Sequence, residues 1–418
     1  MAEPGAKISI ENVYKIFGPD PQSVFDRVKA GASKSEILES TGHTIGIRDV
    51  SLEIGSGEIF VVMGLSGSGK STLIRHINRL IEPTSGRILV DGKDVLQLDA
   101  EELRQLRRFK MSMVFQRFAL LPHKTVIENV MSGLQIRDAT NQGLMPNKTV
   151  LDNIAQVLRL RGATRTDAYD RAMSQIEMVG LAGFEKQFPS ELSGGMQQRV
   201  GLARALVTDA EVLLMDEAFS ALDPLIRNDM QDQLLQIQGE VNRTIVFITH
   251  DLDEALRIGD HIAILNDGEL RQVGTGEEIL LDPADDYVRR FVMDVNRSRV
   301  VTMGSVARQT VTLPDASADI EAITRVVDAS SDGIAVLVDD DGRPTGVATA
   351  ETLRGGGPGY VPATIVPAAS VIEDALALAK ETSCPFCVVD ANGLLVGAAS
   401  QRIILESIAR PEGKISRH

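Results

Sequence analysis

The sequence predicts an α/β protein: a large N-terminal part with a mainly parallel sheet, then a smaller part made of two related α/β units. The first observation is the apolar segment 58–63, which a glycine-rich turn and a helical segment at 70–80 follow. A strand, a turn and a helix in this order, with further apolar strands later, are typical of α/β sheets. The second observation is a repeat, because LVDDDGRPTG at 337–346 and VVDANGLLVG at 388–397 align at an offset of 51 residues.

The N-terminal part begins with strands and one polar segment. Residues 7–17 alternate enough to predict a first strand, and 46–54 predict a second one ahead of the apolar segment. The polar residues 19–43 lie between these strands and contain SKSEILE at 33–39. Because serine is a favourable N-cap, Ser33 predicts a short helix there.

The middle of the chain is mainly helical in pattern from 101 to 204, with one strand expected at 112–115. A short duplication lies in it: LPHKTVIENV at 121–130 returns 24 residues later as MPNKTVLDNI at 145–154. Only two copies occur, so a repeat array is excluded. The simplest interpretation is a duplication in a surface helical region.

Further strands are expected at 211–215 and 244–249, and HIAILNDGELRQVG at 261–274 predicts a hairpin with an Asn-Asp-Gly turn. In the C-terminal repeat, each copy predicts a helix, a strand, an Asp-x-x-Gly turn, a second strand and a second helix. A unit of about 50 residues is too small to be stable alone, so the two units are expected to share a core.

These patterns predict the domain boundaries. We place the first domain at 1–295, with a helical subdomain at about 117–200. The periodicity fades afterwards, which predicts a linker at 296–304. The two repeated units then occupy 305–355 and 356–410.

Charge and composition exclude several classes of protein. The 418 residues contain 43 basic and 58 acidic side chains, a net charge of −15, which argues against nucleic acid as a partner. No segment approaches the roughly 18–20 continuous apolar residues of a membrane span, and no signal peptide is expected at the N-terminus. The two cysteines, Cys384 and Cys387, cannot form a disulfide framework, and a single Cys-x-x-Cys pair favours a core role in a strand. The chain is expected to be cytoplasmic.

The strongest motif follows the third strand directly. The residues Gly64-Leu65-Ser66-Gly67-Ser68-Gly69-Lys70-Ser71 satisfy the pattern GxxxxGK[ST] at the start of a helix. Glycines let backbone N–H groups converge on a phosphate, and the helix N-terminus adds its positive dipole end. Lys70 would reach the β- and γ-phosphates, and the Ser71 hydroxyl would bind Mg²⁺.

A second motif places two carboxylates at the end of an apolar strand, VLLMDE at 212–217. Asp216 is expected to hold the metal ion through water, and Glu217 to polarise the attacking water. Many core strands end in acids, so this signal becomes specific only together with the phosphate motif.

A third motif is LSGGMQ at 192–197, in which Ser193, Gly194 and Gly195 would open a helix and offer a second anion site. The chain already contains one phosphate motif. A second site is useful where it meets the γ-phosphate bound by another copy of the chain.

Together, these motifs resemble those of the ATP-binding subunit of ATP-binding-cassette (ABC) transporters, over about residues 7–290. The resemblance implies a P-loop ABC-type ATPase fold with a mixed sheet and a helical subdomain. It also implies ATP and Mg²⁺ as cofactors and a homodimer with two ATP molecules between the copies. Neither copy alone would have a complete site.

The resemblance also assigns roles to residues. It implies catalysis by Glu217, His250 and Lys70, and metal binding by Ser71, Gln116 and Asp216. It assigns residues 220–223 to a loop across the dimer. The implied nucleotide-binding set is Phe17 (with Tyr14 as second choice for stacking on adenine), Gly64, Leu65, Ser66, Gly67, Ser68, Gly69, Lys70, Ser71, Thr72, Gln116, Ser193, Gly194, Gly195 and Asp223.

A narrower resemblance concerns the transported solute. The polar insertion at 19–43, the strings MGLSGSGKST and MDEAFSALDPLIR, and the C-terminal pair look like the quaternary-amine uptake subfamily. This implies osmoregulatory import of glycine betaine, proline betaine, choline, carnitine or a related solute. The chain would lie at the cytoplasmic face of the inner membrane, with transmembrane permease subunits and an extracytoplasmic solute-binding protein or domain as partners. The C-terminal pair resembles a tandem of cystathionine-β-synthase (CBS) domains, a regulatory module in this subfamily.

Two departures from the family pattern leave alternatives open. The spacing from Gln116 to Ser193 is 77 residues, longer than expected for the family, and the duplication accounts for the additional residues. These residues either form a loop exposed to solvent or alter how the chain docks on the membrane subunits. The segments 346–352 and 397–403 lack the acid that holds a ribose in nucleotide-binding CBS units. We therefore expect no tight binding of AMP or ATP there, and another ligand or a response to ionic strength stays open.

Three other functions are compatible with parts of the sequence. The first is import of amino acids or another cation, since the solute pocket lies in other subunits. The second is a non-transport ABC ATPase of DNA repair or translation, against which the net charge and the lack of a zinc or coiled-coil insertion argue. The third is a CBS sensor with a vestigial ATPase, which the complete catalytic set disfavours.

Overall fold

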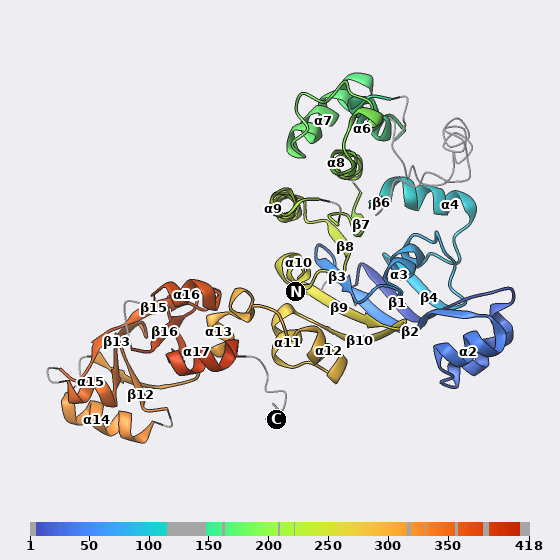
Figure 1. The fold of residues 1–418 in the computed structure, drawn as a ribbon. Coiled ribbons are helices and arrows are strands. Elements are labelled where there is room, and N and C mark those ends of the chain that lie inside the picture. The colour runs from blue at the N-terminus through green and yellow to red at the C-terminus, as the bar shows by residue number, and fades with distance from the viewer. Residues whose placement is uncertain are drawn as a thin grey trace. The chain divides into compact units, whose positions relative to one another are not determined.

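The computed structural model describes residues 6–114, 148–160, 164–207, 210–220, 222–315, 319–330, 332–355, 358–378 and 384–409. The chain divides into two compact units, Met1–Ile279 and Leu280–His418, both drawn in Figure 1. Gln116, the residues 117–147 of the expected helical subdomain and most of the duplication lie outside the described residues. Among those described, no helix combines the length and the apolar character that crossing a membrane requires.

The first unit contains ten described strands. They are β1 (Ile8–Phe17), β2 (Thr44–Ile54), β3 (Ile59–Met63), β4 (Ser85–Val90), β5 (Lys93–Asp94), β6 (Met111–Val114), β7 (Val212–Asp216), β8 (Thr244–Thr249), β9 (His261–Asn266) and β10 (Glu269–Gly274).

Its described helices and helical turns include one π-helical turn, η2. They are η1 (Pro21–Val24), α1 (Phe25–Lys29), α2 (Lys34–Thr41), α3 (Lys70–Ile77), α4 (Ala100–Gln105), η2 (Leu106–Lys110), α6 (Val150–Leu160), α7 (Arg165–Met178), η3 (Pro189–Glu191), α8 (Gly194–Leu206), α9 (Pro224–Val241) and α10 (Leu252–Ile258), with α11 (Gly276–Leu281) at the boundary between the units.

Two sheets form the first unit. The larger has the order β10-β9-β3-β8-β7-β6, parallel from β9 to β6, with β10 antiparallel at the edge. This confirms the expected, largely parallel sheet. The strands expected at 7–17 and 46–54 form a separate antiparallel sheet with the order β2-β1-β4-β5. Strand patterns reveal the strands but not their partners, so the sequence did not separate the two sheets.

Helix α3 connects the two sheets through one apolar core. Leu73, Ile74 and Ile77 of α3 are buried together with side chains of β1, β2 and β4 on one side and β3, β7, β8 and β9 on the other. All residues of β3, β7 and β8 are buried, which explains why these strands are continuous apolar runs in the sequence. The start of α3 is therefore held rigidly at the end of β3.

The polar insertion after β1 contains η1, α1 and α2. Ser33 caps α2 with a reciprocal capping box to Glu36, which confirms the helix start expected there. The insertion packs on the antiparallel sheet through a small cluster that includes Val24, Val28 and Ile37 together with Tyr14 of β1. In Figure 1, α2 lies beside β2.

The predicted hairpin is strands β9 and β10. Asp267 and Gly268 adopt φ angles of 52° and 85° at its turn, as a two-residue turn with positive φ at both positions requires. The turn returns to the glycine-rich loop, defined here as residues 64–71, because the Gly268 N–H donates to the Ser68 carbonyl oxygen at 3.0 Å.

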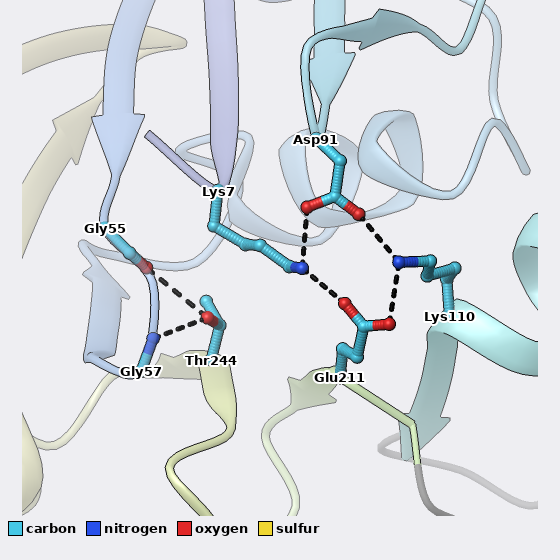
Figure 2. A network of polar contacts seen from close by, with 7 residues as sticks. All are labelled: Lys7, Gly55, Gly57, Asp91, Lys110, Glu211 and Thr244. Atoms are coloured by element: carbon cyan, nitrogen blue, oxygen red, sulfur yellow. Dashed lines mark hydrogen bonds and ion pairs between the residues drawn. The ribbon is translucent and has the colours of Figure 1, made fainter. Parts of the chain in front are cut away.

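A closed ring of four charges ties the two sheets together (Figure 2). Lys7 binds Asp91 at 2.6 Å and Glu211 at 2.5 Å, and Lys110 binds Asp91 at 3.1 Å and Glu211 at 2.6 Å. Lys7 precedes β1 and Asp91 follows β4, whereas Lys110 and Glu211 precede β6 and β7. Hydrogen bonds from Lys110 and Lys7 lower the pKa of Glu211. Burial alone would lower the pKa of Lys7, but its two acidic partners more than offset that effect and raise it.

The second unit contains two halves of the same topology. Its elements are α12 (Asp286–Phe291), η4 (Arg297–Arg299), α13 (Met303–Val306), β11 (Val311–Pro314), α14 (Ile320–Ala329), β12 (Ile334–Val338), β13 (Pro344–Thr349), α15 (Ala350–Arg354), β14 (Val361–Pro362), β15 (Thr364–Pro367), α16 (Ile372–Leu378), β16 (Phe386–Val389), β17 (Leu395–Ala399) and α17 (Gln401–Ile408).

In each half, a strand pairs in parallel with the next strand across a helix, and a hairpin follows: β11-α14-β12-β13 and β15-α16-β16-β17. Cross-strand partners repeat at the expected offset of 51, Leu337 with Gly346 and Val388 with Gly397. The predicted shared core is confirmed, because Ile334, Val336 and Val347 pack with Cys387 and Ala398.

Cys387 lies in this core as expected. It is fully buried and not disulfide-bonded, and burial raises the pKa of its thiol to about 12. A thiol in this state is a poor nucleophile, which agrees with a core role for the Cys-x-x-Cys pair.

The segment expected as a linker, 296–304, differs from that expectation. Val301 and Met303 are fully buried in the core of the second half, and the Met303 N–H donates to the Ser370 carbonyl oxygen at 2.7 Å. The compact second unit also begins at Leu280, before the expected boundary at 295. The turns η4 and α13 are too short to produce a periodic pattern, which is why the sequence looked irregular there.

We predict that the charge ring stabilises the first unit more than an isolated surface ion pair does. Glu211→Gln leaves Lys7 and Lys110 facing a single carboxylate. The free energy of unfolding is expected to fall by about 1 kcal/mol at low salt and by less in 1 M salt. Denaturant unfolding at both salt concentrations measures it. The matched control is Asp232→Asn, which removes one isolated pair with Arg257. Equal losses in the two variants would contradict a cooperative ring.

We also predict that His76 makes the first unit acid-sensitive. Burial lowers the pKa of His76 to about 4. Its Nδ1–H donates to the Ile81 carbonyl oxygen at 2.7 Å, and its Nε2 is buried with no hydrogen-bond partner in the described part of the chain. The unfolded chain takes up this proton near pH 6.5 and the folded chain only near pH 4, so stability falls as the pH drops through that window.

Between pH 7.5 and 5, His76 is expected to lower the free energy of unfolding by about 2 kcal/mol. In His76→Gln, which cannot titrate, the decrease should be smaller by that amount. Denaturant unfolding at both pH values measures the difference. If the free energy of unfolding depended on pH identically in the two proteins, His76 would be protonated equally in the folded and the unfolded chain, against this prediction.

Candidate functional site

The glycine-rich loop is shaped by close backbone contacts. Gly64 and Gly69 adopt φ angles of 147° and 101°. A Cβ atom at Gly64 would lie 2.1 Å from the Leu265 carbonyl oxygen, and one at Gly69 would lie 2.5 Å from that of Gly46. No side chain can occupy these two positions without moving neighbouring backbone. The loop is therefore held closely against β9 at Gly64 and against β2 at Gly69.

Lys70 is folded into this loop. Its side chain is buried, with Nζ donating to the carbonyl oxygens of Gly64 at 2.8 Å and Leu65 at 3.0 Å. Burial lowers its pKa, against the opposing charges of Glu217 and Asp216. The Ser68 side chain is also buried, and its hydroxyl has no hydrogen-bond partner among the described residues. The loop thus presents a cation and an unsatisfied hydroxyl in one place.

Ser71 and Asp216, two of the expected metal ligands, lie together at the base of the loop. The Ser71 hydroxyl donates to Asp216 Oδ1 at 2.8 Å, and Asp216 is fully buried at the end of β7. Arg75 Nη2 binds the second carboxylate oxygen, Oδ2, at 3.1 Å. Sequence reasoning missed Arg75, although its position four residues after Ser71 places both on one face of α3.

Glu217 and His250 form a second polar pair, at the ends of β7 and β8. His250 Nδ1 lies 3.6 Å from Glu217 Oε2; the His250 side chain is 59% exposed and that of Glu217 only 14%. Glu217 has a φ angle of 49°, and its N–H donates to the Ile248 carbonyl oxygen at 3.1 Å. A non-glycine residue in this region is strained, and such strain is concentrated at functional sites.

The two aromatic candidates differ in exposure. Phe17 at the end of β1 is 40% exposed, and Lys15 Nζ lies 5.1 Å from the centre of its ring. Tyr14 is buried and makes an edge-to-face contact with Phe25, with 5.2 Å between ring centres. The structure thus leaves Phe17 available for stacking and places Tyr14 in the core.

Ser193 and Asp223 are N-caps of two helices. The Ser193 side chain accepts the N–H of Met196 at the start of α8, and that of Asp223 accepts the N–H of Ile226 at the start of α9. Both caps and Gly194 are exposed. Within the described part of the chain, no hydrogen bond joins either cap to the glycine-rich loop.

The metal ligands expected from the sequence are only partly assembled in the described residues. Ser71 and Asp216 lie side by side, whereas Gln116 falls outside the described ranges. No group of three or more His, Cys, Asp or Glu side chains suited to a metal ion occurs among the residues with a described position. Two oxygen ligands from the protein suit Mg²⁺, which usually keeps water and phosphate oxygens in its coordination sphere.

Comparisons with known proteins agree with this geometry. A family model described as "ABC transporter" matches residues 47–220. The glycine betaine transport ATP-binding protein OpuAA of Bacillus subtilis is 50% identical over 307 residues, 73% of this chain and 68% of that protein. The glycine betaine/proline betaine transport system ATP-binding protein ProV of Salmonella typhimurium is 42% identical over 419 residues, 97% of this chain and 98% of that protein.

The fold is also found among solved structures. The dimeric structure of MJ0796, a bacterial ABC transporter cassette, superimposes with a TM-score of 0.51 at 29% identity, covering 64% of this chain and 98% of that one. These similarities confirm the resemblance that the motifs carry. The chain therefore belongs to the family of ABC transporter ATP-binding proteins that includes OpuAA and ProV.

Proposed function

We propose that the chain is the ATP-hydrolysing subunit of an ABC importer for a quaternary-amine solute such as glycine betaine. The observation that carries the ATPase is the meeting of Lys70, the Ser71–Asp216 pair and the Glu217–His250 pair at the ends of β3, β7 and β8. The solute class is supported by the names of OpuAA and ProV, both glycine betaine transport proteins.

In the nucleotide complex, the N–H groups of the glycine-rich loop and of Thr72 bind the phosphates. Lys70 exchanges its two carbonyl partners for the β- and γ-phosphate oxygens. Phe17, exposed at the end of β1, stacks on the adenine. Ser71 and Asp216, with Gln116 as third member, would hold a magnesium ion, which would neutralise charge on the transferred phosphoryl group.

Hydrolysis proceeds by in-line attack of a water molecule on the γ-phosphate. Glu217 orients this water, a role that its partial burial beside His250 supports. His250, exposed beside it, contacts the γ-phosphate, and Lys70 stabilises the developing charge.

A second copy of the chain completes each nucleotide site. Ser193, Gly194, Gly195 and Asp223 lie at exposed helix N-termini, where backbone N–H groups and the helix dipole attract anions. The dimeric solved structure of MJ0796 supports this arrangement. The dimer acts at the cytoplasmic face of the membrane with transmembrane permease subunits and an extracytoplasmic solute-binding protein or domain.

The second unit is proposed to be a tandem CBS module with a regulatory role. Each half has the repeated β-α-β-β-α topology, and the halves share a core. The position of the missing ribose acid is occupied by Thr352, which forms a reciprocal capping box with Thr349 and donates to the Gly359 carbonyl oxygen at 2.8 Å. These polar groups are satisfied inside the chain.

Uptake in proteoliposomes is the test of the proposed function. With its membrane and solute-binding subunits, the chain is expected to drive ATP-dependent uptake of one solute from a panel of betaines, choline, carnitine and basic amino acids. Glu217→Gln should still bind ATP but lose at least 100-fold in turnover. Intact ATPase activity without uptake of any quaternary amine would contradict the solute assignment, and normal turnover in Glu217→Gln would contradict its role.

A calorimetric titration tests the prediction for the second unit. The full chain carrying Glu217→Gln, saturated with ATP so that the first unit is filled, is titrated with AMP. We expect no binding tighter than about millimolar, because Thr352 and Ile403 stand at the two positions where nucleotide-binding CBS units carry the acid that holds the ribose. A micromolar affinity would refute this expectation.

A further inference from the structure

The polar insertion begins and ends at the nucleotide site. It leaves the sheet after Phe17, the proposed adenine platform, and returns to it at β2, which begins at Thr44. Gly46 in β2 contacts both parts of the site: a Cβ atom there would lie 2.6 Å from the Phe17 ring, and one at Gly69 would meet the Gly46 carbonyl oxygen. The 26 residues between Phe17 and Thr44 therefore form a loop anchored at the site on both sides.

Lys34, the first residue of α2, reaches from the middle of this insertion to the glycine-rich loop. Its Nζ lies 3.5 Å from the Gly67 carbonyl oxygen and 3.9 Å from Asp267 Oδ1, at the tip of the β9–β10 hairpin. The Lys34 side chain is 34% exposed and that of Asp267 is 72% exposed. Both contacts are long, so the ammonium group is held near the loop without being tied to one acceptor.

Further contacts fix the start of α2 against the hairpin. Arg48 of β2 donates through Nη2 to the Ala32 carbonyl oxygen, and its Nη1 lies 3.3 Å from Glu269 Oε1. Its backbone N–H donates to the Gly268 carbonyl oxygen at 2.8 Å. Since the Gly268 N–H in turn binds Ser68, the insertion, the hairpin and the glycine-rich loop form one connected framework. This framework holds the Lys34 backbone in place beside the loop.

We propose that Lys34 is a further nucleotide-binding residue, which supplies a second cation to the polyphosphate from outside the glycine-rich loop. The proposal rests on ATP being the ligand of this loop, as in the proposed function. Nucleotide phosphates bring a much larger negative charge than Asp267, so the ammonium group turns from the Asp267 carboxylate and the Gly67 carbonyl to a phosphate oxygen. Lysine suits this role because it is a compact charge on a flexible stem.

The prediction is a loss of affinity that depends on the number of phosphates. In the full-length chain, Lys34→Gln should bind ADP and a non-hydrolysable ATP analogue about three- to tenfold more weakly, the range of one partly exposed charge interaction. AMP, with one phosphate, should be affected less. The KM for ATP should rise by a similar factor while kcat stays within twofold. Titration calorimetry and steady-state ATPase assays measure these quantities.

Two variants serve as controls. Lys29→Gln removes an exposed lysine from the same insertion, five residues before Lys34, and should leave nucleotide affinity unchanged. Lys34→Arg keeps the charge and should stay within twofold of the unmodified chain. Equal nucleotide affinities of Lys34→Gln and Lys29→Gln would overturn the proposal. It would also be overturned if the only change in Lys34→Gln were a lower melting temperature in the absence of nucleotide. If the unmodified chain bound neither ADP nor the analogue, the proposed function itself would fail.

Discussion

The structure of the first unit depends on a contact between three backbone segments that leaves no room for side chains. Gly69 and Gly268 both face the carbonyl oxygen of Gly46, and Gly64 faces that of Leu265. Strand β2, the loop before α3 and the β9–β10 hairpin can approach this closely only because glycine occupies these positions. The contact fixes the loop relative to both sheets, so the first N–H groups of α3 point at one place with little freedom.

The chemistry of the site follows from what is buried behind this loop. Asp216 lies at the end of a fully buried strand, and its carboxylate is held on one side by Ser71 and on the other by Arg75. A buried charge needs such partners to offset the loss of solvation. Glu217, the next residue, turns out of the strand with positive φ towards His250. Two adjacent acids are thus in different environments, one fully buried and one at the surface of the site.

The charge ring and the apolar core around α3 stabilise the same arrangement by different means. Leu73, Ile74 and Ile77 join the two sheets through apolar contact, which acts at any ionic strength. Lys7, Asp91, Lys110 and Glu211 join them at the rim, where the side chains are partly exposed. The hydrophobic contact supplies most of the stability, and the ring fixes the relative position of the strand ends.

The sequence by itself determined the local elements and the motifs. The apolar runs of β3, β7 and β8, the Ser33 cap, the Asp267-Gly268 turn and the offset of 51 residues between the C-terminal halves all depend on short-range periodicity or on single residue types. The loop at 64–71 and the acids at 216 and 217 were recognisable for the same reason.

Only the tertiary structure decided which segments meet. The separation into two sheets, the packing of Val301 and Met303 into the second unit, and the contacts of Arg75 with Asp216 and of Lys34 with the glycine-rich loop join residues distant in sequence. Most of these contacts depend on strand order and backbone approach, which leave no periodic pattern in the chain. Composition and spacing therefore predict the central residues of the proposed nucleotide site, whereas packing alone determines which residues surround them.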